Sequence, residues 1–295
     1  MPNLLVSLLP LVLLAGASPF LSDPPQSAEP GELPELRLPF SPYAAPSTRD
    51  EKAILNVEPD GRVVADGAVL LEAAGVESAD AAALTKLDGW LAARAKEMET
   101  GPLAEGSPVL VPSEPLLVRA DALAPFRAVQ LVMERCGSAD VRIVNVELAV
   151  VPSAETLQVG HQATEKRGDW LHAHLPTDLH PPPGEDVEPV ERIEILLRVD
   201  DEGAKVTDDG EPWSPDSDAP FVYDETRALS YQIGPRKMVS VEDVGERLRR
   251  LHLTAPELRV SIDARAGVTH GEVVAVMNRV REAGFDSMTF LGAQR

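Results

Sequence analysis

Apolar residues along this chain recur with the periods of short strands and amphipathic helices. Residues 54–57 and 62–65 are short apolar runs on either side of Pro59-Asp60-Gly61, a pattern that predicts a β-hairpin. A helix is expected to begin at Ser78 as its N-cap and to end at Gly101-Pro102. Its predicted apolar face consists of Ala83, Leu84, Leu87, Leu91 and Ala95.

The pattern continues with a strand, a second helix and a closing strand. Residues 116–120 predict a strand that ends at Asp121, Pro125 is expected to start a helix that Gly137 stops, and residues 141–150 close the unit. The predicted apolar face of this helix consists of Phe126, Val129, Val132 and Met133. The order β-β-α-β-α-β predicts an α+β domain over residues 53–151, with two helices packed on a small β-sheet.

A second copy of the same pattern is expected over residues 191–295. Gly61 and Gly203 are 142 residues apart (203 − 61), and Asp121 and Asp263 are also 142 residues apart (263 − 121). This shared offset indicates a duplicated domain. Residues 211–238 contain no matching long helix and resemble an extended hairpin or loop. The other predicted elements are a hairpin of 193–199 with 204–207, a helix at 241–251, a strand at 258–262, a helix at 273–282 and a strand at 285–291.

Proline-rich stretches with little periodicity lie outside the two predicted domains. Residues 23–52 are predicted to be an extended tether, and residues 152–190 an inter-domain linker; both are expected to pack poorly. The linker contains His161, His172, His174 and His180. No cysteine or ordered carboxylate completes a zinc site there, so a solvated loop is favoured over a metal site.

The N-terminal segment, residues 1–22, contains an uncharged and mostly apolar stretch from Leu4 to Leu21. Its length fits a membrane span, although Pro10 weakens the helix. Ala15-Gly16-Ala17 instead fits the small-x-small cleavage site of a signal peptide. Either alternative sends the rest of the chain across a membrane.

Charge and composition exclude several classes of function. A net charge of −21 argues against nucleic-acid binding and against electrostatic docking on anionic lipid, and a solvated acidic surface is favoured. Arg247, Arg249 and Arg250 stand out as a basic group, which we interpret as a solvated face near a helix C-terminus. Aromatic residues make up only 4% of the chain, so the cores are expected to be aliphatic.

The sequence contains no recognisable catalytic constellation. It lacks a Gly-rich phosphate loop, a nucleophile elbow, a zinc-protease helix and paired carboxylates at an interpretable spacing. Cys136 is the single cysteine and is expected to be a small buried apolar residue. Asp121 and Asp263, at strand-to-helix junctions, are expected to cap turns. We therefore predict no enzyme and no catalytic, cofactor-binding or metal-binding residues.

Residues 258–263 form a strand ending in aspartate, residues 270–277 read His-Gly-Glu-Val-Val-Ala-Val-Met, and Ala283-Gly284 precedes a closing strand. With this pattern, the second domain resembles the periplasmic domains of the ExbD/TolR family. Residues 116–121 and the helix after them are similar to the same pattern, although that helix is shorter before Gly137. Asp60-Gly61-Arg62, followed by Asp66-Gly67, resembles the first hairpin of the family.

This resemblance implies a bacterial inner-membrane protein with one span and a periplasmic bulk. Such a protein works with an ExbB/TolQ-type membrane subunit, oligomerises through its periplasmic domains and couples the proton gradient to transport of biopolymers or to work on the cell envelope. When residues 2–9 are aligned with the start of the family's span, Leu5 occupies the place of its proton-carrying aspartate. We therefore predict an accessory component. The alternative is a cleaved periplasmic protein that uses the duplicated domain as a binding scaffold.

Overall fold

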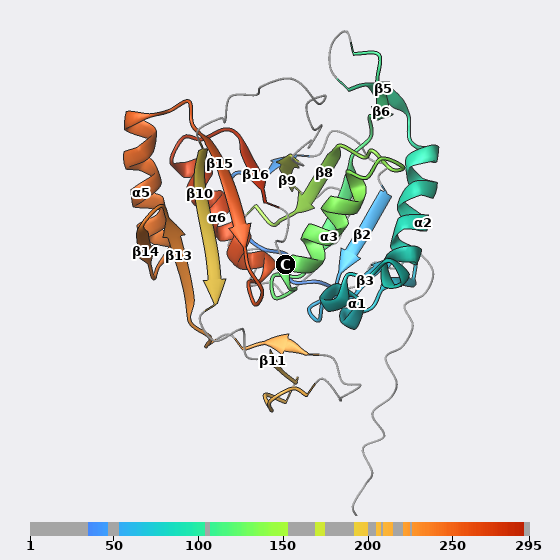
Figure 1. Ribbon diagram of the computed structural model, residues 1–295, viewed down its shortest axis with the longest axis horizontal. Helices are drawn as coiled ribbons and strands as arrows, with labels where there is room; N and C mark the ends of the chain where they lie inside the picture. The colour runs from blue at the N-terminus through green and yellow to red at the C-terminus, as the bar shows by residue number, and fades with distance from the viewer. Residues whose placement is uncertain are drawn as a thin grey trace, which may run out of the picture.

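Two large β-sheets with helices packed against them form the described part of the chain, a mixed α+β structure as predicted (Figure 1). The computed structural model describes residues 35–46, 53–103, 107–152, 169–174, 192–199, 205–207, 209–214, 221–224 and 226–291. Within these ranges none of the helices combines the length and the apolar character needed to cross a bilayer. Residues 1–22, the predicted span or signal segment, lie outside them.

The first sheet has the strand order β1-β9-β8-β7-β2-β3-β4. Strands β2, β7 and β8 are parallel, and β3 and β4 continue the sheet in antiparallel pairs. Asn56 pairs with Val64, which confirms the predicted first hairpin, and Asp66-Gly67 then turns the chain into β4, a strand that was not predicted. The bounds are β1 Ala45–Pro46, β2 Ala53–Val57, β3 Val63–Ala65, β4 Ala68–Leu71, β7 Leu116–Ala120, β8 Asn145–Ala149 and β9 Asp169–His174.

Helices α1 (Ala73–Ser78) and α2 (Ala81–Glu97) follow β4, and the prediction that Ser78 caps the long helix is wrong. Ser78 ends α1, because Ala79 adopts a left-handed conformation with φ of 46°. Asp80 is the N-cap of α2, and its Oδ1 accepts a hydrogen bond of 2.8 Å from the Ala83 amide. Of the five predicted face residues, Leu84, Leu87, Leu91 and Ala95 are buried, and Ala83 is half-buried.

The chain from α2 to β8 differs from the prediction mainly at the ends of elements. Gly101-Pro102 lies in β5 (Thr100–Pro102), which pairs with β6 (Leu110–Pro112), and α2 ends earlier, at Glu97. Helix α3 (Phe126–Cys136) starts after Pro125 as predicted and buries its four predicted face residues. Strand β8 is shorter than predicted because Arg142, with φ of 56°, interrupts the extended conformation.

The second sheet has the strand order β14-β13-β10-β15-β16. Strands β10, β15 and β16 are parallel, and β13 and β14 continue in antiparallel pairs, so strand directions follow the same order as in β4-β3-β2-β7-β8. Helices α5 and α6 pack against this sheet and each other. The bounds are β10 Arg192–Val199, β13 Leu229–Ile233, β14 Arg236–Met238, α5 Val241–Thr254, β15 Arg259–Ala264, α6 His270–Glu282 and β16 Met288–Phe290.

The predicted hairpin between 193–199 and 204–207 is wrong. Strand β11 (Lys205–Val206) pairs with β12 (Val222–Tyr223), whereas β10 takes β13 as its antiparallel neighbour. The residues around β11 and β12 form a small aromatic cluster, in which the ring centroids of Trp213 and Phe221 lie 5.1 Å apart. Strand β13 contributes the buried side chains of Tyr231 and Ile233 to the main core, which explains why it is the partner of β10.

Parts of the predicted tether and linker pack against the first sheet, contrary to expectation. Leu36 and Leu38 are only 2% and 4% exposed and lie against Leu117 and Ala149. Their period of two is that of an extended segment with one buried face. Strand β9, inside the predicted linker, pairs with β8 and holds His172 and His174; His161 and His180 lie outside the described residues.

Candidate functional site

The two sheets are joined where helices α3 and α6 begin. The Phe126 amide donates to the Val268 carbonyl at 2.9 Å, and the His270 amide donates to the Ala124 carbonyl at 2.8 Å. Pro125 and Thr269 form an antiparallel bridge. Phe126 and Val268 are separated by the same offset as Asp121 and Asp263 (268 − 126 = 142). The junction therefore pairs Phe126 of the first predicted domain with Val268, the residue at the equivalent position in the second.

Gly271 and His270 make this junction tight. The Gly271 amide donates to the Ala122 carbonyl at 2.8 Å, and a Cβ on Gly271 would lie 2.9 Å from that oxygen. His270 is fully buried and its ring stacks on Phe126, with centroids 6.2 Å apart. Neither ring nitrogen has a hydrogen-bond partner, and burial lowers the pKa of His270 to about 3. The imidazole is therefore neutral at pH 7.

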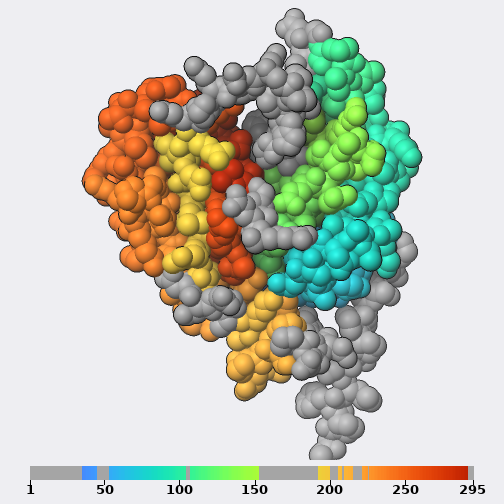
Figure 2. All heavy atoms as spheres, in the orientation of Figure 1, coloured from blue at the N-terminus to red at the C-terminus, as the bar shows by residue number. Residues whose placement is uncertain are grey.

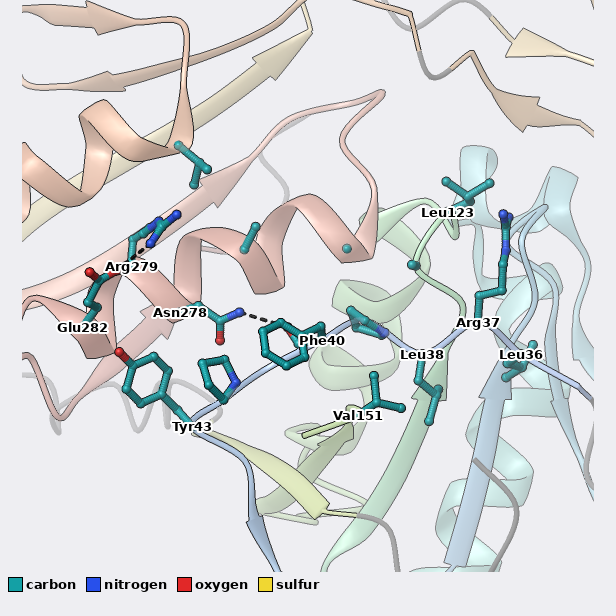
Figure 3. Close-up of a pocket in the computed structure, with 16 residues that line it drawn as sticks. Leu36, Arg37, Leu38, Phe40, Tyr43, Leu123, Val151, Asn278, Arg279 and Glu282 are labelled. Carbon is teal, nitrogen blue, oxygen red and sulfur yellow. Dashed lines mark hydrogen bonds and ion pairs between the residues drawn. The ribbon is translucent and has the colours of Figure 1, made fainter. Parts of the chain in front are cut away.

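Residues 35–46, which we name the strap, cross this junction (Figure 3). The Arg37 amide donates to Asp121 Oδ2 at 2.8 Å, which ties one end of the strap to the first sheet. Further along, Asn278 on α6 donates from Nδ2 to the Phe40 carbonyl at 2.9 Å, and Ser41 Oγ lies 2.6 Å from Asn278 Oδ1. The strap is thus bonded to both halves of the described structure.

A groove of about 760 Å³ lies between the strap and α6. Its walls are mostly apolar, and Phe40, Tyr43 and Leu123 line it together with Gly271 and Ala275 of α6 (Figure 3). The titratable groups in its lining are Arg37, Tyr43, Arg279 and Glu282. Arg279 donates to Glu282 at 2.6 Å and to Glu242 at 3.0 Å. This arrangement can hold an extended or apolar ligand, and its described lining does not pair a nucleophile with a base.

The two aspartates that share the 142-residue offset have different environments. Asp121 caps a turn as predicted, because its Oδ1 accepts a hydrogen bond of 2.9 Å from the Leu123 amide. Asp263 does not: it lies inside β15 and its Oδ2 is 2.6 Å from the Arg265 guanidinium. Burial raises the pKa of the Asp263 carboxyl above its usual 3.8, and the nearby Glu194 carboxylate adds to the rise, while Arg265 opposes it.

The other residues considered as sites lie in elements of the fold. Cys136 is fully buried in the core between α3 and its sheet, and this burial raises the pKa of its thiol, as expected for a small apolar residue. His172 and His174 belong to the strand that completes the first sheet. Across the described ranges, no group of three or more His, Cys, Asp or Glu residues is placed to hold a metal ion.

Arg227 is an important contact that the sequence did not reveal. Its side chain is 3% exposed, and its Nη2 lies 2.7 Å from both carboxylate oxygens of Glu272. Its Nε donates to the Gly267 carbonyl at 2.9 Å. Glu272 also completes the capping box of α6 with Thr269. A single arginine in an aperiodic stretch gave no signal, whereas the alternation of Leu36, Leu38 and Phe40 could have identified the strap.

Comparison with known proteins gives one result for this chain. A family model described as biopolymer transport protein ExbD/TolR matches residues 170–294, which include all of β9 except Asp169 and all of the second sheet. Searches of curated proteins and of solved structures returned no match. The C-terminal part of the chain, residues 170–294, is therefore similar to the ExbD/TolR family.

Proposed function

We propose that this protein is a component of a proton-motive-force-linked complex that transports biopolymers or acts on the cell envelope. The observation that carries this proposal is the ExbD/TolR match over residues 170–294. Members of that family are transport-energy components without enzymatic activity and work with ExbB/TolQ-type membrane subunits. By this reasoning the chain sits in the inner membrane with its bulk in the periplasm and oligomerises through its periplasmic domains.

We also propose that the chain carries two ExbD/TolR-like domains, at residues 53–151 and 191–295. The shared order of strand directions and the shared offset of Asp121 and Asp263 support this duplication. The copies differ in the length of chain between their two paired parallel strands. Paired residues are 63 positions apart in β2 and β7 (116 − 53) and 67 positions apart in β10 and β15 (259 − 192). Residues 23–52 precede the first domain, and residues 152–190 connect it to the second.

The role we assign within such a complex is accessory. Residues 1–22 contain no Asp or Glu, and Leu5 occupies the place of the family's proton-carrying aspartate. The first acidic residue is Asp23, beside Pro24 and beyond the apolar stretch. A leucine cannot bind or release a proton, so the proton-carrying carboxylate must come from another subunit.

Reconstitution tests both the assignment and the accessory role. The full chain is placed in liposomes with an ExbB/TolQ-type subunit, and proton flux is measured with no other ExbD-like chain present. We expect the two proteins to co-purify and the flux to equal that of the partner alone. Gradient-dependent flux above that level would refute the accessory role, and failure to co-purify would refute the partnership.

A cleaved periplasmic scaffold is the second candidate, favoured by the small-x-small sequence Ala15-Gly16-Ala17. Mass spectrometry of the mature N-terminus separates the two. An intact segment 1–22 supports the membrane-anchored component, and a terminus just after Ala17 supports the scaffold.

A further inference from the structure

One end of the groove between the strap and α6 carries an available cation. Arg37 lines this end, and its side chain is 46% exposed. Its guanidinium is paired with Asp121, but the distance from Nη2 to Oδ1 is 3.6 Å, which is too long for a hydrogen bond. Among the described residues, none accepts a hydrogen bond from this guanidinium, so its N–H donors remain available there. This end of the groove therefore offers a positive charge and hydrogen-bond donors to an anionic group.

The polar groups at the other end of the groove are already engaged within the protein. Arg279 donates to Glu282 at 2.6 Å and to Glu242 at 3.0 Å, so its positive charge is neutralised. Asn278 is bonded to two groups of the strap, a carbonyl and a hydroxyl. A ligand therefore gains more from placing an anionic group beside Arg37 than from placing it at this end.

Between these two ends the groove is long and mostly apolar. Arg37 and Glu282 lie at opposite ends in Figure 3, and Leu123 and Phe40 are among the residues that line the groove. Gly271 and Glu282, both in the lining, are 11 positions apart on α6 (282 − 271), which corresponds to about 16 Å along the helix. A chain of about twelve carbons covers most of this length, at roughly the 1.2 Å per bond of an extended backbone.

We propose that this groove binds a fatty acid, with its carboxylate on Arg37 and its single hydrocarbon chain between the strap and α6, towards Tyr43. A carboxylate and a guanidinium are both planar, so two parallel N–H···O bonds can join them. The chain removes apolar wall from water, and the volume of about 760 Å³ is within the range of small-ligand sites, about 300–1,000 Å³.

The acidity of the whole protein does not prevent this binding. The net charge is −21, but charges further away than about 8 Å are largely screened at physiological salt, so a small anion responds mainly to Arg37. The site also does not depend on the proposed partnership with a membrane subunit.

The probe is dodecanoate, titrated into the full chain in a calorimeter at concentrations below those at which it forms micelles. Dodecan-1-ol and dodecyltrimethylammonium, which carry the same chain on a neutral and on a cationic head, are the control ligands. We expect one dodecanoate to bind per chain, and each control to bind about tenfold more weakly or less. Equal binding of the three ligands, or many dodecanoates per chain, would indicate adsorption to apolar surface and would overturn the proposal.

A substitution at Arg37 tests where the head group lies. Arg37→Gln keeps the backbone amide that bonds Asp121 and removes the charge, so it should weaken binding of dodecanoate about tenfold and leave dodecan-1-ol unchanged. The matched control is Arg236→Gln, an exposed arginine of β14, which lies on the outer side of the second half in orange in Figures 1 and 2. Unchanged binding of dodecanoate in Arg37→Gln, or an equal loss in the control, would overturn the proposal.

A second pair of variants tests where the hydrocarbon chain lies. Ala275 is a half-buried residue of α6 in the groove wall, so Ala275→Phe fills the space that the chain needs and should weaken dodecanoate and dodecan-1-ol alike, by about tenfold or more. Ala93→Phe, at an exposed position of α2, is its control and should leave both affinities unchanged. Urea unfolding midpoints show whether each variant is folded. Unchanged affinity in a folded Ala275→Phe would place the chain elsewhere and overturn the proposal.

Discussion

At the scale of single residues, burial changes the pKa of His270 and of Asp263 in opposite directions. Both side chains lose water, and in both the neutral form is favoured, so the histidine pKa falls and the aspartate pKa rises. Asp263 stabilises the folded state when the pH is below 3.8, the usual pKa of an aspartate. This contribution disappears as the pH rises through the higher pKa that Asp263 has in the folded protein. His270 stabilises the folded state at pH values above the pKa that this histidine has in the unfolded chain, and that contribution is lost as the pH falls.

Replacing His270 by Leu should make the protein more resistant to acid. Between its usual 6.5 and about 3, the unfolded chain carries a proton on this histidine and the folded chain does not, so the wild type loses stability as pH falls. The advantage of the variant over the wild type should therefore grow by up to about 1.4 kcal/mol per pH unit in this range. Urea unfolding at neutral pH and near pH 5 measures it. A difference that is independent of pH would show that His270 does not titrate in this way.

Asp121 and Asp263 should respond differently to the same substitution. Asp121→Ala removes the acceptor of two part-buried hydrogen bonds, from the amides of Arg37 and Leu123, which should cost roughly 1–3 kcal/mol. Asp263→Ala removes a carboxylate whose described partner is the half-exposed Arg265 side chain, so its loss should be smaller. Chemical unfolding of both variants gives the comparison. A larger loss in Asp263→Ala would contradict the assigned role of Asp121.

At the scale of elements, the close contact between the start of α6 and the segment before α3 depends on a glycine. Gly271→Val should push the Ala122 carbonyl away, since even a Cβ would lie 2.9 Å from that oxygen. We expect a loss of about 1–3 kcal/mol, the range for overpacking. Gly89→Ala in α2 is the control: nothing lies within 4 Å of its added Cβ, so it should stabilise the helix by about 0.5–1 kcal/mol. If both variants gained stability, the contact at Gly271 would not be tight.

Elements with a strong periodic signal were predictable, and those defined by distant partners were not. Phe126, Val129 and Val132 recur at helical spacing and are buried in α3, because a local pattern decides which face of a helix is apolar. The antiparallel partner of β10 is β13, about thirty residues further along the chain, whereas the local pattern favours the nearer run at 204–207. In the strap, the alternation of Leu36 and Leu38 lies in a proline-rich stretch that is typical of a tether. The burial of these two leucines depends on the first sheet, which other parts of the chain form.

The candidate site was less predictable than the fold, because most of its contacts join distant segments. Arg227 bonds Glu272, and Phe40 bonds Asn278, across separations that no local pattern encodes. Turn capping by Asp121 was predictable because its acceptor role is local. Asp263 has the same sequence context but lies within a longer strand, where Arg265 replaces the turn amide as its partner.

At the scale of the whole molecule, one strand crosses between the two halves. Strand β9 lies in the region that matches the ExbD/TolR family, yet it completes the first sheet by pairing with β8 rather than joining the second. The first sheet therefore contains a strand from the C-terminal half of the sequence. A substitution near residue 170 should change the stability of the first sheet.

Proline at both Leu171 and His172 should loosen β8. In an antiparallel strand, the backbone N–H groups of alternate residues point towards a given partner strand. One of the two neighbouring residues therefore donates to β8, and proline at both positions removes that hydrogen bond. Hydrogen exchange followed by mass spectrometry should show faster exchange in Asn145–Ala149, with β10 and β15 unchanged. Faster exchange in the second sheet instead would show that β9 supports that sheet.

The backbone pairing around Phe126 and Val268 also has a consequence for how the protein behaves on dilution. Two separate chains that met through such a contact would come apart as their concentration fell. Here both sides belong to one polypeptide, so their effective concentration is set by the connecting chain and not by the number of molecules in the compartment. The joined arrangement, with the groove beside it, is therefore available even at the lowest expression levels, and no second copy has to be found first.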